Sequence, residues 1–205
     1  TCFGSNNVGQ ITGDVAGGPV DVAALFTFSE IAGGVTHVCG RTATGDMYCW
    51  GNNASGQLGV NPLTTPFSTT VRQIGGLTGV GDIAIGSDHS CARVSNTVRC
   101  WGANTVGQLG DGTTTLSLAP VTAILPDAPI LSLTSGSNTT CAIQATGETY
   151  CWGDNQGDKL LILGQTKNDA FSSTPVLIDI TVDALPVTIE AIEHGSGHGC
   201  VLTDQ

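Results

Sequence analysis

Four copies of one short motif divide this 205-residue chain into units of about 50 residues. The copies begin at Cys2, Cys49, Cys100 and Cys151, so successive copies lie 47, 51 and 51 residues apart. Three of them read Cys-Trp-Gly with Asn and Gly at fixed positions downstream, and the first reads Cys-Phe-Gly. A fixed period of this length indicates a repeat architecture in which each unit packs on its neighbours.

A second repeated element lies upstream of each Cys-Trp-Gly motif. It is a short apolar run that ends in Gly, followed by a segment that contains a cysteine. The four cysteine segments read His37-Val38-Cys39, His89-Ser90-Cys91, Thr139-Thr140-Cys141 and His198-Gly199-Cys200. Polar turns such as Thr44-Gly45-Asp46 follow the cysteine segments, and looser apolar segments such as 120–124 precede the apolar runs.

Four short antiparallel strands per unit predict the blade of a β-propeller. No segment has the 3.6-residue periodicity of an amphipathic helix. We therefore predict one all-β domain over residues 1–205, a propeller of about four four-stranded blades. Either the N- and C-terminal strands share a blade and close the ring, or the chain is an excerpt of a longer array.

Charge and hydropathy exclude several classes of partner. The chain has 17 acidic residues against 6 Lys and Arg, a net charge of −11, which leaves too few bases for a nucleic-acid surface. No apolar run reaches the length of about 18 residues that a membrane span needs. The first residues, Thr1 to Gly4, fall inside a motif, so we expect that a signal peptide was removed or that the chain is cut from something longer.

The motif Cys-Trp-Gly-x-Asn-x-x-Gly-Gln-Leu-Gly at residues 100–110, preceded by His89-Ser90-Cys91-Ala92, resembles the regulator-of-chromosome-condensation repeat. It is most similar to the cysteine-rich version found in secreted bacterial proteins. The resemblance implies a propeller, commonly of seven blades in that family, whereas this chain has four copies. It also implies nucleotide exchange on a small GTPase and chromatin binding, and the cysteines and the acidity argue against both.

The eight cysteines fall into pairs set by the repeat. Within each complete unit the two cysteines are 10, 9 or 10 residues apart, a spacing that places them opposite each other on neighbouring strands of a hairpin. The predicted disulfides join Cys39 to Cys49, Cys91 to Cys100, and Cys141 to Cys151. Cys2 and Cys200 remain. Either they form a disulfide within one chain, or they form one between two molecules, or the chain belongs to a longer array.

The alternative to disulfides is metal binding, because His and Cys recur together at His37 and Cys39 on one strand face. Structural zinc uses closely spaced cysteine pairs, and hairpin spacing favours disulfides instead. Disulfides imply an oxidising compartment, so we expect a secreted or cell-surface protein. We expect no metal and no cofactor, since Asp154-x-Gln156-x-Asp158 also lacks the Gly and terminal Glu of a calcium loop.

Other repeated residues have structural interpretations. The histidines at positions 37, 89 and 198 share one repeat position, which indicates packing, and His194 is expected on the surface. We expect the aromatic residues at positions 3, 50, 101 and 152 to pack between blades with the indole N–H bonded to a neighbour, rather than to stack on sugars. The glutamines at positions 10, 57 and 108 should bridge blades. Asn53 and Asn138 lie in glycosylation sequons, and Asn138 is the better candidate because Asn53 is also a repeat position that serves the turn.

The sequence contains no exposed nucleophile motif, no paired carboxylates and no Gly-rich phosphate loop, so we predict a non-enzymatic protein. The primary hypothesis is an extracellular structural or protein-interaction scaffold, in which the loops that vary between repeats contact protein or glycan. These loops are residues 13–28, 61–76, 111–119 and 158–174. The alternatives are self-association into a head-to-tail filament or surface layer, an enzyme-inhibitor-like binder, and a glycan-binding module.

Overall fold

The computed structural model describes residues 26–156, 170–178, 181–182, 185–194 and 199–204, and these residues form sixteen β-strands. The β-branched and alternating apolar segments of the repeats become short strands, and their Gly-rich boundaries become turns. Among the described residues no helix has the length and apolarity needed to cross a membrane.

Three units form complete four-stranded antiparallel sheets, each in sequential strand order. The first blade contains β1 (Phe28–Gly33), β2 (His37–Thr42), β3 (Met47–Asn52) and β4 (Phe67–Gln73). The second contains β5 (Val80–Ile85), β6 (His89–Val94), β7 (Thr97–Gly102) and β8 (Ser117–Thr122). The third contains β9 (Ile130–Ser135), β10 (Thr139–Gln144), β11 (Thr149–Asp154) and β12 (Phe171–Ile178).

The fourth unit differs from the predicted four-stranded blade in the described part of the chain. It contains the hairpin of β15 (Ile189–His194) and β16 (Gly199–Thr203), which form a two-stranded sheet. A short hairpin of β13 (Thr181–Val182) and β14 (Leu185–Pro186) precedes it. The residues around Cys2, which were expected to share the last blade, lie outside the described residues, so ring closure stays a prediction.

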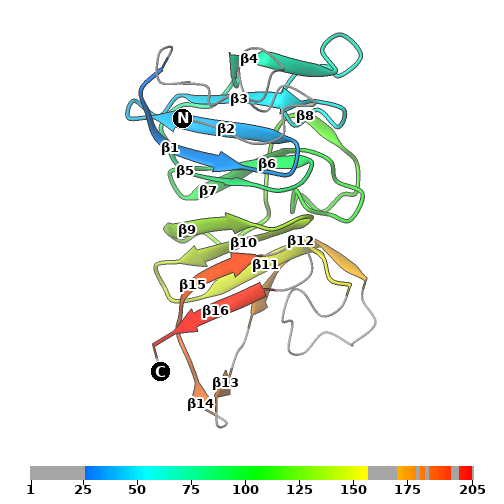
Figure 1. The fold of residues 1–205 in the computed structure, drawn as a ribbon. Coiled ribbons are helices and arrows are strands. Elements are labelled where there is room, and N and C mark those ends of the chain that lie inside the picture. The colour runs from blue at the N-terminus through cyan, green and yellow to red at the C-terminus, as the bar shows by residue number, and fades with distance from the viewer. Residues whose placement is uncertain (1–25, 157–169, 179–180, 183–184, 195–198, 205) are drawn as a thin grey trace.

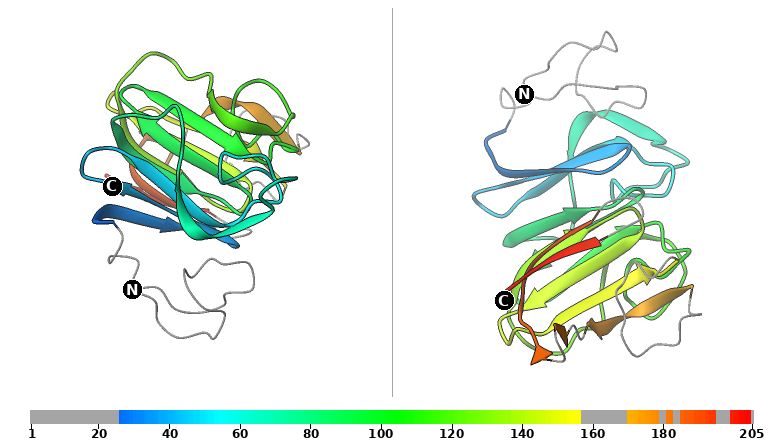
Figure 2. Two further views of the ribbon diagram at one scale, coloured as in Figure 1. Left: turned by 90° about the horizontal axis from the view of Figure 1, so that it is seen from above. Right: turned by 60° about the horizontal axis from the view of Figure 1, so that its bottom comes forward.

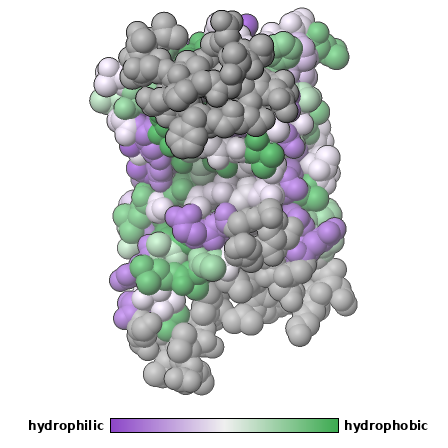
Figure 3. Space-filling model, in the orientation of Figure 1, coloured by the Kyte–Doolittle hydropathy of each residue, from purple (hydrophilic) through white to green (hydrophobic). Residues whose placement is uncertain are grey.

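The blades stack face to face in chain order, from the β1–β4 sheet at one end to β15–β16 at the other (Figure 1). Their first strands, β1, β5, β9 and β15, contact one another in sequence and form the inner side of the stack. The outermost strands are β4, β8 and β12, and Figure 2 shows the successive sheets twisted relative to one another. On the face drawn in Figure 3, hydrophobic residues gather over β15–β16.

The hydrophobic core lies between the blades rather than within one of them. Cys39, Cys49 and Leu58 of the first unit share a buried cluster with Ile83 and Trp101 of the second. A second cluster joins the next two units and includes Trp152, and a third joins Cys141 and Ile143 to Ile189 and Ile192 of β15. Each blade therefore depends on the next for its burial, as expected for a repeat that cannot fold alone.

The Gly of each Cys-Trp-Gly motif has a positive φ, 105° at Gly51, 103° at Gly102 and 99° at Gly153. The pairing register of the third strand shifts at this point in all three blades, which is a β-bulge. At Gly153 an added Cβ would also overlap the main-chain oxygen of Asn138. The motif requires Gly here for both reasons, because a side chain would be strained and would clash.

Candidate functional site

The three predicted intra-blade disulfides are present in the structure. Cys39–Cys49, Cys91–Cys100 and Cys141–Cys151 each join residues directly opposite on the second and third strands, with Cα atoms 4.1 Å apart. Their exposed fractions are 0–3%, so the sulfur atoms belong to the core. Because these sulfurs are bonded to each other, they are not available as thiolate ligands for a metal.

Cys200 differs from the other described cysteines. It lies on β16, it is exposed, and it carries a free thiol. Its expected partner, Cys2, lies outside the described residues. The bridge between them therefore stays a prediction.

The repeated histidines connect neighbouring blades. His37 Nε2 lies 2.9 Å from the hydroxyl of Ser90 in the second blade, and His89 Nε2 lies 2.9 Å from the hydroxyl of Thr140 in the third. Both rings are completely buried. Burial lowers the pKa of His37 to about 3, with a smaller contribution from nearby His89, and it lowers the pKa of His89 to about 4. Both histidines are therefore neutral above pH 5. The third repeated histidine, His198, lies outside the described residues.

The tryptophans form hydrogen bonds across the same interfaces between neighbouring blades. Trp101 Nε1 donates to the main-chain oxygen of Gln57 at 2.9 Å, and Trp152 Nε1 donates to that of Gln108 at 3.0 Å. The expectation of an indole N–H bonded to a neighbouring blade is confirmed for both residues. Trp50 is also completely buried, and Phe3 lies outside the described residues.

The two described repeat glutamines bridge neighbouring blades, as expected. Gln57 Nε2 donates to Asp88 in the second blade at 3.2 Å. The stronger link is its main-chain oxygen, which accepts from Trp101 and also from the Ser90 hydroxyl at 3.0 Å. Gln108 binds the third blade through its main-chain oxygen in the same way, accepting from Thr140 at 3.1 Å. Gln10 lies outside the described residues.

Ser90 and His37 have the spacing of a nucleophile and its general base. Both residues are completely buried, and the Ser90 hydroxyl donates to the Gln57 oxygen. No substrate can reach this hydroxyl without separating the two blades. The pair is therefore part of the joint between blades.

Replacing Ser90 by Ala is expected to lower the free energy of unfolding by about 1–3 kcal/mol. The reason is that His37 Nε2 and the Gln57 oxygen would each lose a buried hydrogen-bond partner. Ser90→Thr is the matched control, because Thr140 occupies the same position in the third blade. Urea unfolding followed by Trp fluorescence measures both variants, and an equal loss in both would contradict this explanation.

Asn53 and Asn138 occupy different environments. Asn53 is completely buried, and its side-chain nitrogen donates to the carbonyls of Val60 at 3.0 Å and Thr65 at 2.6 Å. Because this nitrogen is buried and already bonded, it has no room for a glycan in the folded chain. This corrects the prediction of Asn53 as a glycosylation candidate. Asn138 is half-buried in the turn between β9 and β10, and its glycosylation stays a prediction.

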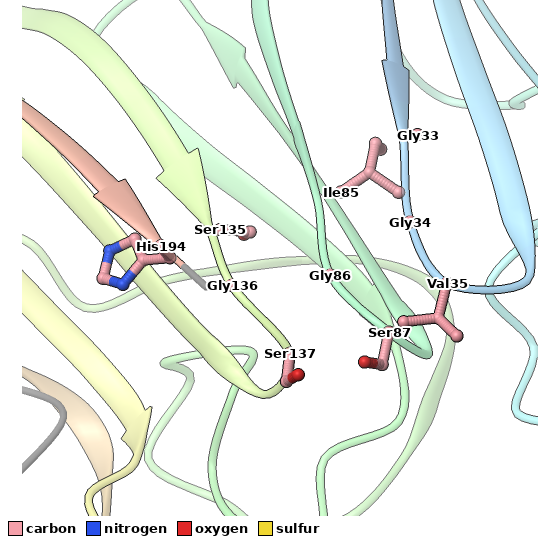
Figure 4. Close-up of a pocket in the computed structure, with 10 residues that line it drawn as sticks. All are labelled: Gly33, Gly34, Val35, Ile85, Gly86, Ser87, Ser135, Gly136, Ser137 and His194. Carbon is pink, nitrogen blue, oxygen red and sulfur yellow. The ribbon is translucent and has the colours of Figure 1, made fainter. Parts of the chain in front are cut away.

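A pocket of about 270 Å³ opens where the inner turns of three blades meet β15 (Figure 4). The turns are those between β1 and β2, between β5 and β6, and between β9 and β10. Its lining residues are Gly33, Gly34, Val35, Ile85, Gly86, Ser87, Ser135, Gly136, Ser137 and His194. The Gly that ends each apolar run permits the close approach of these turns, since a Cβ at position 34 would overlap the Gly86 oxygen.

Two hydroxyl groups lie opposite each other in this pocket. The side chains of Ser87 and Ser137 point toward one another in Figure 4. The main-chain N–H of Ser87 donates to the main-chain oxygen of Ser137 at 2.7 Å. Neither hydroxyl bonds to a described residue. The pocket therefore offers polar groups that the described part of the fold does not use.

His194 corrects the expectation of a surface histidine. It is half-buried at the end of β15, where it lines the pocket, and its Nε2 lies 3.2 Å from Cys141 Sγ. Burial lowers its pKa. Sequence reasoning missed the pocket because its lining comes from four units, although the repeated Gly at each turn was visible.

The pocket lies on one face of the stack, which we call the pocket face. It contains the three inner turns and the loops 53–66 and 103–116, because the N–H groups of residues 52 and 103 bond to the inner-turn oxygens of Thr36 and Asp88. Five large hydrophobic side chains are exposed at this end of the strands. They are Val35 (69%), Leu63 (93%), Phe67 (53%), Leu116 (51%) and Phe171 (41%).

The variable loops predicted to bind a partner are only partly described. Residues 61–66 and 111–116 contribute to the pocket face, whereas residues 13–25 and 158–169 lie outside the described residues. The described parts of these variable loops therefore lie on the same face as the pocket that the inner turns form.

Two models of the regulator of chromosome condensation (RCC1) repeat match this chain. One covers residues 28–57 and 82–108, and the other covers residues 44–93 and 96–143. Together they span more than half of the sequence. The chain belongs to the RCC1 repeat family. The resemblance inferred from the Cys-Trp-Gly motif is thus confirmed for the family.

The similar proteins have longer chains. The mitochondrial RCC1 domain-containing protein RUG3 of Arabidopsis thaliana is 28% identical over 92% of this chain and 42% of its own length. Yeast RCC1 (Prp20), solved with Kap60 bound, has a TM-score of 0.79 at 20% identity over 98% of this chain and 49% of its own. The ectodomain of the Physcomitrella patens receptor kinase CR4 has a TM-score of 0.57 at 24% identity, over 100% and 43%. This chain therefore spans about half the length of these proteins.

Proposed function

We propose that this RCC1-repeat chain is a non-enzymatic, extracellular protein-binding scaffold that binds its partner with the pocket face. The observation that carries the proposal is the set of exposed hydrophobic side chains at the pocket-face end of the strands, where Val35 lines the pocket and Phe67, Leu116 and Phe171 lie at or next to the outer strands β4, β8 and β12. Exposed apolar groups gathered on one face of a folded domain are typical of protein interaction sites. The hydroxyls of Ser87 and Ser137, which bond to no described residue, add specific polar contacts in the pocket.

The chemistry of the described histidines supports a binding role over catalysis. His37 and His89 are buried and neutral, and each is bonded to a hydroxyl of the next blade. A general base must reach the substrate proton, and these rings cannot do so. His194 reaches the pocket, but its Nε2 contacts Cys141, a disulfide sulfur without nucleophilic thiolate.

The three disulfides support an oxidising compartment, such as the cell surface or the medium. The fold also occurs in the ectodomain of the plant receptor kinase CR4. The net charge of −11 opposes a nucleic-acid partner. A protein partner agrees with the solved structure of Kap60 bound to yeast RCC1 (Prp20), a protein of this fold.

The proposal includes completion of the fourth blade. β15 and β16 correspond to the two inner strands of the other blades, and Cys2-Phe3-Gly4 corresponds to their third strand. We propose that a strand with this sequence pairs with β16 and that Cys2 bridges Cys200. Closing the last sheet in this way removes an open edge.

A capture experiment tests the pocket face. Immobilised wild-type protein is exposed to surface proteins and medium of the source cells, in parallel with a Val35→Asp/Phe67→Asp variant. Ala43→Asp is the control, because residue 43 is exposed in the turn at the opposite end of β2. We expect a partner that wild type and control retain and that the double variant loses at least about tenfold, which corresponds to about 1.4 kcal/mol.

Two results would overturn this proposal. Equal capture by all three proteins would place binding elsewhere on the molecule. Binding of free glycans by the wild type, with loss in the double variant and no protein partner, would make the pocket face a glycan site.

A further inference from the structure

A second pocket, of about 350 Å³, lies between the third blade and β15. It opens beside the turn between β10 and β11, at the end of the strands opposite the pocket face, and we call it the joint pocket. Its lining is mainly apolar, and its size is in the range of sites for small molecules. Its walls include Leu131, Ser132 and Ile143 of the third blade and Thr188, Ile189 and Glu190 at the start of β15.

In the first two blades an acidic residue and an arginine face each other at the corresponding position. The strand register places Glu30 opposite Arg41 in the first blade and Asp82 opposite Arg93 in the second. Arg41 Nε donates to Glu30 Oε2. Because residues two positions apart on a strand share a face, Arg41 lies on the side of Cys39, whose cluster packs on the second blade. An aliphatic stem with a guanidinium group therefore lies where these two blades meet.

The third blade has a different pair at this position. Ser132 stands opposite Ile143, so both the carboxylate and the arginine are missing. Ile143 shares a face with Cys141 and belongs to the cluster that joins the third blade to Ile189. Its side chain is shorter than that of arginine and carries no charge. The joint pocket therefore opens where the first two blades have an acid–arginine pair.

The turn of the third hairpin is also packed less tightly on the next blade than the turn of the first hairpin. The Val80 N–H donates to the Gly45 oxygen at 3.0 Å, and among the described residues no such bond joins Ile189 to Gly147. A Cβ added at Gly45 would lie 2.7 Å from the main chain of the second blade. At Gly147 it would meet only a methyl carbon of Thr188 at 3.5 Å. The looser turn leaves space for a ligand.

The charges around the joint pocket favour a cation. Glu190 lines the pocket and forms no hydrogen bond or ion pair with a described residue. Asp204 lies nearby, since its Oδ1 accepts from the Thr188 N–H at 3.0 Å. All four described arginines belong to the first two blades, and the described residues of the third and fourth units contain neither Lys nor Arg. This part of the molecule therefore has no described cation to pair with Glu190.

A buried hydroxyl beside the joint pocket also lacks a described partner. Thr149 stands opposite Ile143 and therefore lies on the same face of the hairpin. It is 1% exposed, and its Oγ1 bonds to no described residue. The first two blades have Met47 and Val98 at this position, and neither side chain needs a hydrogen-bond partner. A ligand with an N–H donor that enters beside Ile143 would give this hydroxyl a partner.

We infer that the joint pocket binds a small organic cation, a guanidinium or ammonium group on an aliphatic stem of several carbons. The stem packs on Ile143 and Ile189, and the charged group pairs with Glu190. The ligand thus takes the place that the Arg41 side chain has in the first blade. Two sources share this chemistry, a free alkylguanidine or alkylamine and the side chain of an arginine or lysine in a partner protein. The site is separate from the pocket face and gives the scaffold a second binding function.

Methyl-resolved NMR of the full chain tests the site with n-butylguanidinium as the probe. We expect the methyl signals of Ile143 and Ile189 to shift with a Kd of about 1 mM. The neutral analogue n-butylurea has nearly the same shape and should bind about fivefold more weakly or less. Glu190→Gln should weaken binding of n-butylguanidinium by a similar factor. Glu148→Gln is the matched control, because Glu148 is exposed in the neighbouring turn and does not line the pocket.

A second variant restores the residue pair of the first blade. Ser132→Glu/Ile143→Arg should fill the joint pocket and abolish binding, while unchanged tryptophan fluorescence shows that the blades still pack. A peptide with one Arg between Gly residues separates the two sources of the cation. Affinity equal to that of n-butylguanidinium assigns the site to a side chain of a partner protein. Affinity at least about tenfold lower assigns it to a free small molecule.

Any of three results would overturn the inference. Equal affinity for n-butylguanidinium and n-butylurea would show that the site does not recognise the charge. Equal weakening by the substitutions at Glu190 and Glu148 would place the cation outside the joint pocket. The absence of shifts at Ile143 and Ile189, or shifts that persist in the filled variant, would show that the pocket is not the binding site. None of these results would affect the capture experiment on the pocket face.

Discussion

Lowering the pH from 7 to 4 is expected to reduce the free energy of unfolding by an amount on the order of 6 kcal/mol. The cause is the pair of buried histidines, because burial lowers the pKa of His37 to about 3 and that of His89 to about 4. In the unfolded chain both bind a proton near pH 6.5. The contribution of the two histidines to the free energy of unfolding is fully present above that pH. It is lost as the pH falls toward their folded-state pKa values.

Other groups modify this profile in known directions. Burial also lowers the pKa of His194, which adds to the loss on acidification. Burial raises the pKa of Asp82, although its bond to the Leu133 N–H opposes this shift. Protonation of Asp82 therefore has the opposite sign and recovers some stability as the pH falls through its raised pKa. The effect of the histidines dominates because both rings are completely buried.

Variants isolate the histidine contribution from that of the carboxylates. Urea unfolding at pH 7 and pH 4.5 gives the free energy of unfolding for wild type and for His37→Gln/His89→Gln, in which a neutral amide can still bond to Ser90 and Thr140. The difference between the two pH values should be several kcal/mol smaller in the double variant. An identical pH dependence in both proteins would contradict the assignment.

Reduction of the three buried disulfides is expected to lower the free energy of unfolding by about 2–3 kcal/mol for each bridge. Each bridge closes a loop of 9 or 10 residues within one blade. Because the loops are of nearly equal length, the three bridges restrict the unfolded chain to a similar extent. The total is comparable with the whole stability of an ordinary domain. The reduced protein should therefore unfold at a much lower urea concentration than the oxidised protein.

The burial of these disulfides predicts slow reduction of the folded protein. The six bonded cysteines have exposed fractions of 0–3%, so a reductant reaches their sulfurs only when a blade opens. Thiol release is measured after alkylation of any free Cys200, with and without urea, alongside the unfolding midpoints. Cys91→Ala/Cys100→Ala removes one bridge as a local comparison. Equal midpoints for oxidised and reduced protein would contradict the expected stabilisation.

The blades and their disulfides were predictable because they depend on local contacts. A turn of a few residues sets the register of each hairpin, and that register places Cys39 opposite Cys49. The strands, the Gly of the third strand and the family followed from the same repeated pattern. The third and outer strands expected for the fourth blade could not be tested, since Cys2 lies outside the described residues.

Functions of single side chains were harder to predict. Asn53 lies in a sequon, yet it is a buried turn residue, and His194 lines a pocket rather than an open surface. A sequon or an isolated histidine carries no information on burial. Gln108 bridges blades as expected, but it does so through its main-chain oxygen, a group that every residue has.

The sequence by itself determined the repeat, the four-strand unit and the hairpin that each disulfide joins, since these depend on residues at most about 50 positions apart. The tertiary structure alone decided which groups of successive blades meet. The bond from Trp101 to Gln57, the contact of His37 with Ser90 and the convergence of the inner turns on one pocket all depend on the rotation between blades. That rotation results from the packing of cores shared between units, which no single repeat encodes.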